Sequence, residues 1–134
     1  MEAIHSSGAP SAIAPYSQAI RHQGLLYTCG QIALDPASGK LVTGGIEAQT
    51  HQAMKNLAAV VKAGGSRMSQ VIKTTVFLAD MADYPKVNAI YLEYFPQAPR
   101  PARSAVAVAG LPLGALIEID CIAACEPADQ TYQY

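Results

Sequence analysis

The chain has 134 residues, of which 51% are hydrophobic and 14% are charged, and its formal net charge is −1. A chain of this length and composition folds as one domain with its own core, which excludes intrinsic disorder. The near-neutral charge offers no basic surface for a nucleic-acid backbone, so nucleic acid is not an expected partner.

The N-terminal part of the chain is typical of strands joined by turns. A short strand over residues 2–6 leads into a Gly/Pro/Ser-rich loop over 6–15. The segments 16–22 and 25–32 flank Gln23-Gly24, a pair that favours a hairpin turn. Residues 35–40, with the sequence DPASGK, indicate a second turn.

A helix is predicted from about 46 to 63. Apolar residues recur there at helical spacing, through Met54, Leu57 and Val61. Gly64-Gly65 supplies a left-handed stop. The opposite face, which we expect to be solvated, carries Glu47, Gln52, Lys55, Asn56 and Lys62.

The second half of the chain alternates strands and a helix. Residues 70–79 are β-branched and apolar, which favours a central strand, and 83–95 read as a helix with Pro85 in its first turn. Residues 101–109 and 115–124 are two further strands. The order β-β-β-α-β-α-β-β predicts an α+β sandwich, with a mixed sheet and both helices on one face.

The last two strands are rich in Val, Ile and Ala on both faces. A chain of this size cannot easily cover both sides of such a sheet. We therefore expect an oligomer that packs sheet faces together.

Two charged residues interrupt these last two strands. Arg103 shares a strand face with Ala105 and Ala107, and Glu118 shares one with Asp120. If the GLPLG connection at 110–114 closes a hairpin, Arg103 lies opposite roughly residues 117–121, near Glu118. A slip of one residue in the register would reverse the faces.

Two readings of this pair remain open. The first is a structural salt bridge within the chain. The second is a small-molecule site, in which the guanidinium of Arg103 holds a carboxylate through two charge-assisted hydrogen bonds. In that site the ionised Glu118 would orient or deprotonate a water molecule.

The cysteines and histidines indicate no metal centre. Cys29, Cys121 and Cys125 are odd in number, and the three histidines are scattered without ligand spacing. The N-terminus lacks the basic and apolar regions of a signal peptide, and no apolar run reaches the roughly 20 residues of a membrane span. We therefore expect a cytoplasmic protein with reduced thiols, no metal and no membrane partner.

Several separate blocks resemble one known family. The segment PARSAVAVAGLPLGALIEID at 101–120 is similar to the signature of the RidA/YjgF family, which hydrolyses reactive enamines and imines. AIAPYSQAI at 12–20, YTCGQIALDPASGKLV at 27–42 and VIKTTVFLADMADYPKVNAIYLEYF at 71–95 resemble the same family in the same order. The resemblance spans about 4–125. It implies one RidA-like domain over 1–125, followed by a polar tail at 126–134 that we expect to be frayed.

The resemblance implies a chorismate-mutase-like (bacillus-type) α+β fold and a homotrimer with clefts between its subunits. It also implies a 2-aminoacrylate or 2-iminopropionate type of substrate, a 2-ketoacid and ammonia as products, and no cofactor. By position, Arg103 matches the arginine that grips the substrate carboxylate, and Glu118 the acid that activates water. The remaining matches are Tyr16, which closes the cleft, the backbone carbonyl of Ala105, Asn88 on the second helix, and Cys29 and Gly30 on the cleft wall.

The sequence departs from the family pattern at three of its positions. Cys29 stands where relatives usually carry serine, so one contact to the substrate is weakened or lost. Cys29 could instead be a reactive thiol near Arg103, or a small buried hydrophobic residue. Ala105 stands where many relatives carry cysteine, and Arg100 where many carry an aromatic residue.

Two alternative functions are a small-carboxylate-binding or chaperone-like trimer without turnover, and an endoribonuclease or translation inhibitor. The sequence favours catalysis, because a mere anion binder gains nothing from Glu118 beside its ligand.

Overall fold

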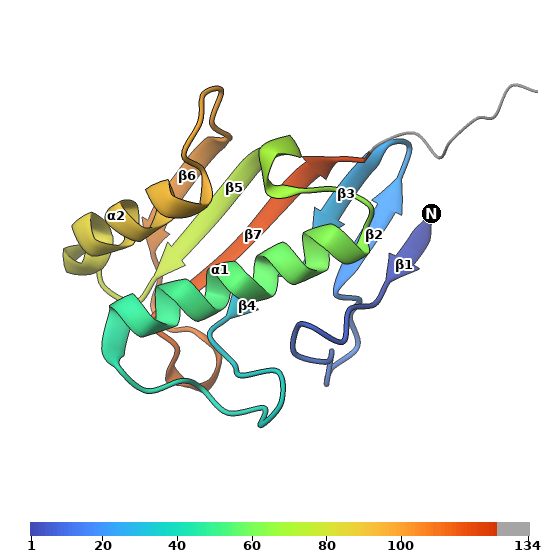
Figure 1. Ribbon diagram of the computed structural model, residues 1–134. Coiled ribbons are helices and arrows are strands. Elements are labelled where there is room, and N and C mark those ends of the chain that lie inside the picture. The colour runs from blue at the N-terminus through green and yellow to red at the C-terminus, as the bar shows by residue number, and fades with distance from the viewer. Residues whose placement is uncertain (126–134) are drawn as a thin grey trace, which may run out of the picture.

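A mixed seven-stranded sheet forms the body of the protein, and both α-helices pack on one of its faces (Figure 1). The computed structural model describes residues 1–125. The α+β class, the position of the helices and the order of the elements confirm the sequence-based prediction, with one short extra strand, β4. The elements are β1 (Glu2–Ile4), β2 (Ala19–His22), β3 (Leu25–Thr28), β4 (Gln31–Ile32), α1 (Gly45–Ala63), β5 (Val71–Leu78), α2 (Tyr84–Tyr94), β6 (Ala102–Ala107) and β7 (Ile117–Ala124).

The strand order across the sheet is β1-β2-β3-β7-β5-β6, and β4 also pairs with β7. All neighbouring strands are antiparallel except β5 and β6, which are parallel. The chain leaves the end of β5, runs back through α2, and enters β6 in the same direction as β5. A helical crossover of this kind is how parallel neighbours are joined.

The hairpin that the GLPLG connection suggested is wrong, because β5 lies between β6 and β7. Thr74 of β5 is aligned with Arg103 on one side and with Cys121 on the other. Thr74 and Cys121 are buried beneath the helices, so Arg103 faces the helix layer. Glu118 is aligned with Phe77, three positions along β5 from Thr74. Strand alternation therefore puts Arg103 and Glu118 on opposite faces of the sheet.

The predicted hairpin at Gln23-Gly24 is confirmed. β2 and β3 pair in register from Ala19 opposite Thr28 to His22 opposite Leu25. Gln23 and Gly24 both have positive φ, at 51° and 76°. That backbone is the type I′ turn, whose twist matches the twist of the flanking strands.

The C-terminal end of α1 lies directly on β3. Gly65, with φ of 79°, provides the left-handed stop that the sequence indicated. A Cβ atom added to Gly64 would lie 2.5 Å from Leu26 Cδ1. Leu26 is completely buried, so Gly64 leaves the space that this core leucine fills.

Asn56 was expected on the solvated side of α1, and this expectation is wrong. Its side chain is completely buried. Asn56 Nδ2 donates to the carbonyl oxygens of Ile32 at 3.1 Å and Leu34 at 2.8 Å, and its Oδ1 accepts from Gln52 Nε2 at 2.9 Å. A buried amide with all these partners clamps the chain that leaves β4 onto the helix.

The sheet face without helices carries both polar and apolar side chains. Lys73 Nζ donates to Ser104 Oγ at 3.1 Å on this face. Tyr27 and Val106 are 44% and 45% exposed there. Within residues 1–125, no helix is long and apolar enough to cross a membrane.

Replacing Asn56 with alanine is expected to lower the free energy of unfolding by about 3 kcal/mol, because two buried carbonyl groups lose their donor. Urea unfolding at a fixed protein concentration measures this loss. Gln52→Ala is the matched control, since it removes a partner of the same amide from a half-buried position one turn earlier. Equal stability of the Asn56→Ala variant and the native protein would contradict the clamp.

Candidate active site

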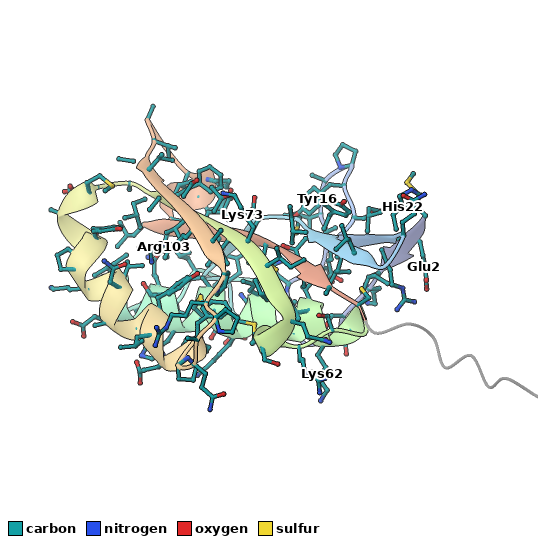
Figure 2. All side chains as sticks on the ribbon, turned by 90° about the horizontal axis from the view of Figure 1, so that it is seen from above. Glu2, Tyr16, His22, Lys62, Lys73 and Arg103 are labelled. Atoms are coloured by element: carbon teal, nitrogen blue, oxygen red, sulfur yellow. The ribbon has the colours of Figure 1, made fainter. Side chains whose placement is uncertain are left out.

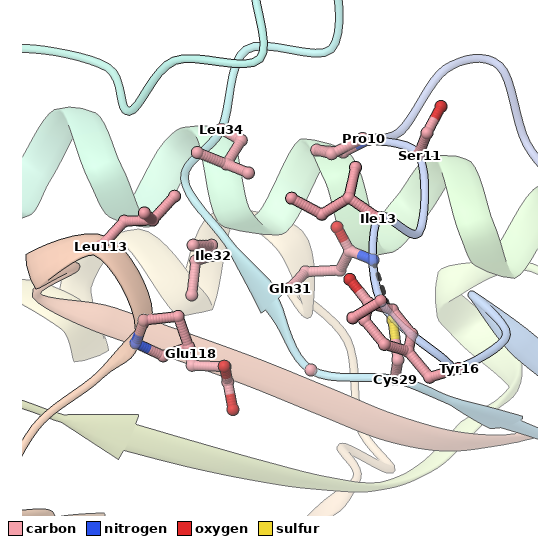
Figure 3. A pocket seen from close by; sticks show the side chains of 13 residues that line it. Pro10, Ser11, Ile13, Tyr16, Cys29, Gln31, Ile32, Leu34, Leu113 and Glu118 are labelled. Atoms are coloured by element: carbon pink, nitrogen blue, oxygen red, sulfur yellow. Dashed lines mark hydrogen bonds between the residues drawn. The ribbon is translucent and has the colours of Figure 1, made fainter.

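A cavity of about 500 Å³ opens beside Glu118. Apolar side chains form most of its wall, and among residues 1–125 Glu118 is the only charged residue that lines it (Figure 3). A pocket of this volume, with few polar groups on an apolar wall, is typical of a small-molecule site. The lining residues are Pro10, Ser11, Ile13, Ala14, Tyr16, Cys29, Gly30, Gln31, Ile32, Leu34, Pro112, Leu113 and Glu118.

The carboxylate of Glu118 lies against the backbone of Gly30. A Cβ atom at Gly30 would stand 2.6 Å from both Glu118 Cδ and Oε2, so only glycine leaves room for the carboxylate in this position. Burial raises the pKa of Glu118 above its ordinary value of 4.5, and the neighbouring charge of Asp120 raises it further. A carboxylate with a raised pKa is a stronger base than one in water.

Tyr16 and Cys29 line the same cavity as Glu118, as the family resemblance implied. Tyr16 is 52% exposed, and its pKa is raised by burial and by the nearby Cys29 and Glu118. Gln31 Nε2 donates to Cys29 Sγ at 3.3 Å (Figure 3). Burial nevertheless raises the pKa of Cys29, so the sulfur is a protonated thiol with low reactivity.

Gln18 supports the loop that lines the cavity, and the sequence analysis did not identify it. This side chain is 2% exposed. Its Oε1 accepts from Ser6 N at 2.6 Å, and its Nε2 donates to the carbonyl oxygens of Ser6 at 3.1 Å and Pro10 at 2.7 Å. These bonds fix the loop that supplies Pro10, Ile13 and Tyr16 to the cavity. A glutamine inside the predicted strand segment 16–22 was the only signal, because side-chain bonds to a distant loop leave no periodic pattern.

Arg103 lies outside this cavity and beside α2 (Figure 2). Its Nη2 donates to Tyr84 Oη at 2.8 Å. The guanidinium carbon lies 4.7 Å from the centre of the Tyr91 ring and 5.3 Å from that of Tyr84, within the range of cation–π attraction. Among the residues that the structure describes, no carboxylate forms an ion pair with Arg103. The reading of a salt bridge between Arg103 and Glu118 within one chain is therefore wrong.

Asn88 and Ala105 lie on the same side of the sheet as Arg103. Asn88 follows Tyr84 by one helical turn on α2, and its Oδ1 is buried with no hydrogen-bond partner within residues 1–125. Ala105 is two residues after Arg103 on β6 and is aligned with the buried Val76. The predicted site residues thus form two groups, one around Glu118 and one around Arg103. Cys29 belongs to the first group and is not a neighbour of Arg103.

Comparisons with known proteins identify the family. Residues 6–125 match the model of the family described as "Endoribonuclease L-PSP". "2-Iminobutanoate/2-iminopropanoate deaminase" from Mus musculus is 49% identical over 124 residues, which covers 92% of this chain and 91% of that protein. The chain belongs to the RidA/YjgF family.

Two further RidA/YjgF members extend the comparison. "Reactive Intermediate Deaminase A, chloroplastic" from Arabidopsis thaliana is 50% identical over 122 residues, which is 91% of this chain but 65% of that longer protein. The solved structure of the Rid-family protein YyfA from Yersinia pestis superposes with a TM-score of 0.89 at 46% identity, covering 92% of this chain and 98% of that one. The chorismate-mutase-like fold expected from the resemblance is confirmed. Because one relative is chloroplastic, a cytoplasmic location stays a prediction.

No group of three or more His, Cys, Asp or Glu side chains within residues 1–125 of this RidA/YjgF protein is arranged to hold a metal ion. Two acidic residues of β7, Glu118 and Asp120, interact with each other, and the charge of Asp120 raises the pKa of Glu118. The arrangement around the cavity is suited to proton transfer at a carboxylate beside a small bound molecule. The polar tail expected at 126–134 lies outside the described residues.

Gly30→Ala tests whether the glycine holds the place of the carboxylate. The added methyl group is expected to push Glu118 out toward solvent, which lowers the pKa of its carboxyl group toward 4.5. NMR titration of the glutamate carboxyl carbons measures this change. Gly110→Ala is the matched control, because a Cβ at Gly110 meets nothing within 4 Å. An unchanged Glu118 pKa in Gly30→Ala would contradict the close contact.

Proposed function

We propose that this chain hydrolyses reactive imines and enamines of small 2-amino acids to 2-ketoacids and ammonia. The observation that carries the proposal is Glu118, a carboxylate with a raised pKa on the wall of a largely apolar cavity. The names of relatives about 50% identical over most of this chain support the same chemistry. The substrates we propose are of the 2-aminoacrylate and 2-iminopropionate type.

The site that we propose lies between subunits of a homotrimer. Arg103 and Glu118 lie on opposite faces of the sheet, so one chain cannot direct both at the same small molecule. A neighbouring copy that brings its Arg103 edge to the mouth of the Glu118 cavity would complete the site. Tyr27 and Val106, which are exposed on the sheet face without helices, support the packing of such faces together.

In the proposed complex, Arg103 binds the substrate carboxylate through its fork of N–H groups. This contact and the cavity wall hold the imine carbon near Glu118. The carbon of an imine is already electrophilic, so positioning it and one water molecule provides most of the catalysis. An enamine reacts after its tautomerisation, in which a proton moves from nitrogen to the terminal carbon.

Glu118 acts as the general base in the first step. The water oxygen bonds to the imine carbon, the π pair of the C=N bond moves to nitrogen, and Glu118 takes a water proton and passes it to that nitrogen. In the second step the C–N bond breaks, the remaining hydroxyl proton follows the nitrogen, and a carbonyl group forms. The nitrogen collects both protons of the water and leaves as ammonia, so water is the only co-reactant.

The other predicted residues have supporting roles in this proposal. Tyr16, at the rim of the cavity, donates its phenol hydrogen to the substrate as the cleft closes. Gly30 keeps the space for the Glu118 carboxylate, and the thiol of Cys29 forms part of the wall. Across the cleft, the backbone carbonyl of Ala105 accepts a hydrogen bond from the substrate nitrogen or the water, and Asn88 completes the polar surface around Arg103.

The cavity supports hydrolysis of an imine better than the two alternatives. Cleavage of RNA by acid and base catalysis would call for histidines, and none of the three in this sequence lines the cavity. A site that only binds small carboxylates would be weakened by Glu118, because its charge repels the ligand.

Arg103→Ala and Glu118→Gln are each expected to lose imine hydrolysis, but trimers that mix the two variants are expected to regain activity. A mixed trimer contains one cleft with both native residues, because the two groups come from different subunits. Co-expression with two affinity tags isolates such trimers. Pyruvate release is then measured with a serine or cysteine dehydratase that generates 2-aminoacrylate. Inactive mixed trimers would rule out a site shared between subunits, and native rates equal to buffer would rule out the enzyme.

The pH profile tests the role of Glu118 as a base. Activity is expected to fall as the pH drops through the Glu118 pKa, so the acid limb of kcat/KM lies above 4.5. Asp120→Asn is expected to move this limb to lower pH, because it removes the neighbouring charge that helps to raise the pKa. Thr75→Val is a useful comparison, since it removes a hydrogen bond to Asp120 and keeps its charge. A limb that stays in place in Asp120→Asn would assign the base to another group.

A further inference from the structure

The hydroxyl group of Tyr84 has a hydrogen for which residues 1–125 provide no acceptor. Tyr84 Oη accepts a hydrogen bond from Arg103 Nη2 at 2.8 Å, which uses a lone pair of the oxygen and leaves its own hydrogen free. Within residues 1–125, no second partner of this hydroxyl is present. Tyr84 is half-buried, so its hydrogen can reach a molecule that arrives from outside.

The guanidinium of Arg103, beside Tyr84, also has hydrogen-bond donors without an acceptor among the described residues. Of its N–H groups, only one on Nη2 has an acceptor among the described residues, and that acceptor is Tyr84. Its neighbours on the helix side are the rings of Tyr84 and Tyr91, which attract the cation and accept no strong hydrogen bond. Because Arg103 is only half-buried, its remaining donors are open to an anion that arrives from outside the chain.

The position of this pair is fixed from the core. Tyr91, whose ring centre lies 4.7 Å from the Arg103 guanidinium, shares a hydrogen bond of 2.8 Å with Thr74 Oγ1. Thr74 is completely buried and is aligned with Arg103 in the sheet. Tyr84 is the first residue of α2, directly after the turn that follows β5. The guanidinium and the phenol are thus held side by side before any ligand binds.

We infer that Tyr84 is a second carboxylate-binding residue, which donates its hydroxyl hydrogen to the same substrate carboxylate that Arg103 binds. This inference rests on the proposed function, because it concerns the substrate of that site. Tyr84 Oη and Arg103 Nη2 are 2.8 Å apart, so two oxygens of one carboxylate, or a single oxygen, can accept from both groups. The pair selects ligands with a free carboxylate, since an ester or amide would leave one of the donors poorly matched.

The experiment measures binding and turnover in Tyr84→Phe, which keeps the ring beside Arg103 and removes only the hydroxyl. Titration calorimetry with 2-ketobutyrate is expected to show binding about tenfold weaker than in the native protein, the usual effect of one hydrogen bond to a charged group. KM for the imine is expected to rise by the same factor while kcat stays unchanged, because the contact holds the carboxylate before and during the reaction. Tyr94→Phe is the matched control on the same helix, since its hydroxyl contacts His51.

A double-mutant cycle with Arg103→Lys separates direct contact from an effect through Arg103. Lysine lacks the fork that Tyr84 could orient, so a direct contact predicts that Tyr84→Phe still weakens 2-ketobutyrate binding in the Arg103→Lys protein. Unchanged binding in Tyr84→Phe, or an effect that disappears in Arg103→Lys, would overturn the inference. A native protein that binds 2-ketobutyrate with this dependence on Tyr84 but hydrolyses no imine would overturn the proposed function and uphold the role of Tyr84.

Discussion

The parallel pairing of β5 and β6 determines what a single chain can do. The crossover through α2 places β6 at the outer edge of the sheet and turns Arg103 toward the helix layer. β7, on the other side of β5, turns Glu118 toward the opposite face. A strand has only two faces, so no change of rotamer brings these two side chains together across a packed sheet. Each of the two groups is organised by its own surroundings, and the site that we propose combines them across a boundary between subunits.

The two halves are built by different physical means. In the group around Glu118, Gly30 has no side chain and so leaves space for the carboxylate. The buried amide of Gln18 holds the N-terminal loop in place through hydrogen bonds. The Arg103 half depends on aromatic rings and hydroxyl groups that are anchored at the buried Thr74. Contacts within the chain position both groups, which reduces the ordering that binding has to impose.

The sequence predicted the positions of the helices and strands better than it predicted which strands pair in the sheet. Periodicity located α1, and Gln23-Gly24 located the hairpin, because both signals are local. The partner of β6 depends on a crossover through α2, and the GLPLG connection suggested a hairpin that does not form. Asn56 was assigned to the solvated face of α1 because its side chain is polar. Its partners, the carbonyl groups of Ile32 and Leu34, lie more than twenty residues earlier in the chain, so the helical pattern gave no sign of them. For the site, the family resemblance identified four residues that line one cavity, which are Tyr16, Cys29, Gly30 and Glu118. Arg103, Asn88 and Ala105 lie outside that cavity. The contacts of Gln18 and Tyr84 join distant segments, so no local pattern records them.

The protonated state of Cys29 has a consequence for the competition between nucleophiles in the cavity. A thiolate attacks an electrophilic carbon far more readily than water does, and on the wall of this cavity it would trap an imine as a sulfur adduct. Burial keeps the sulfur in its weakly nucleophilic form. In the proposed reaction, the same desolvation that makes Glu118 a better base would therefore protect the protein from capture by its own substrate.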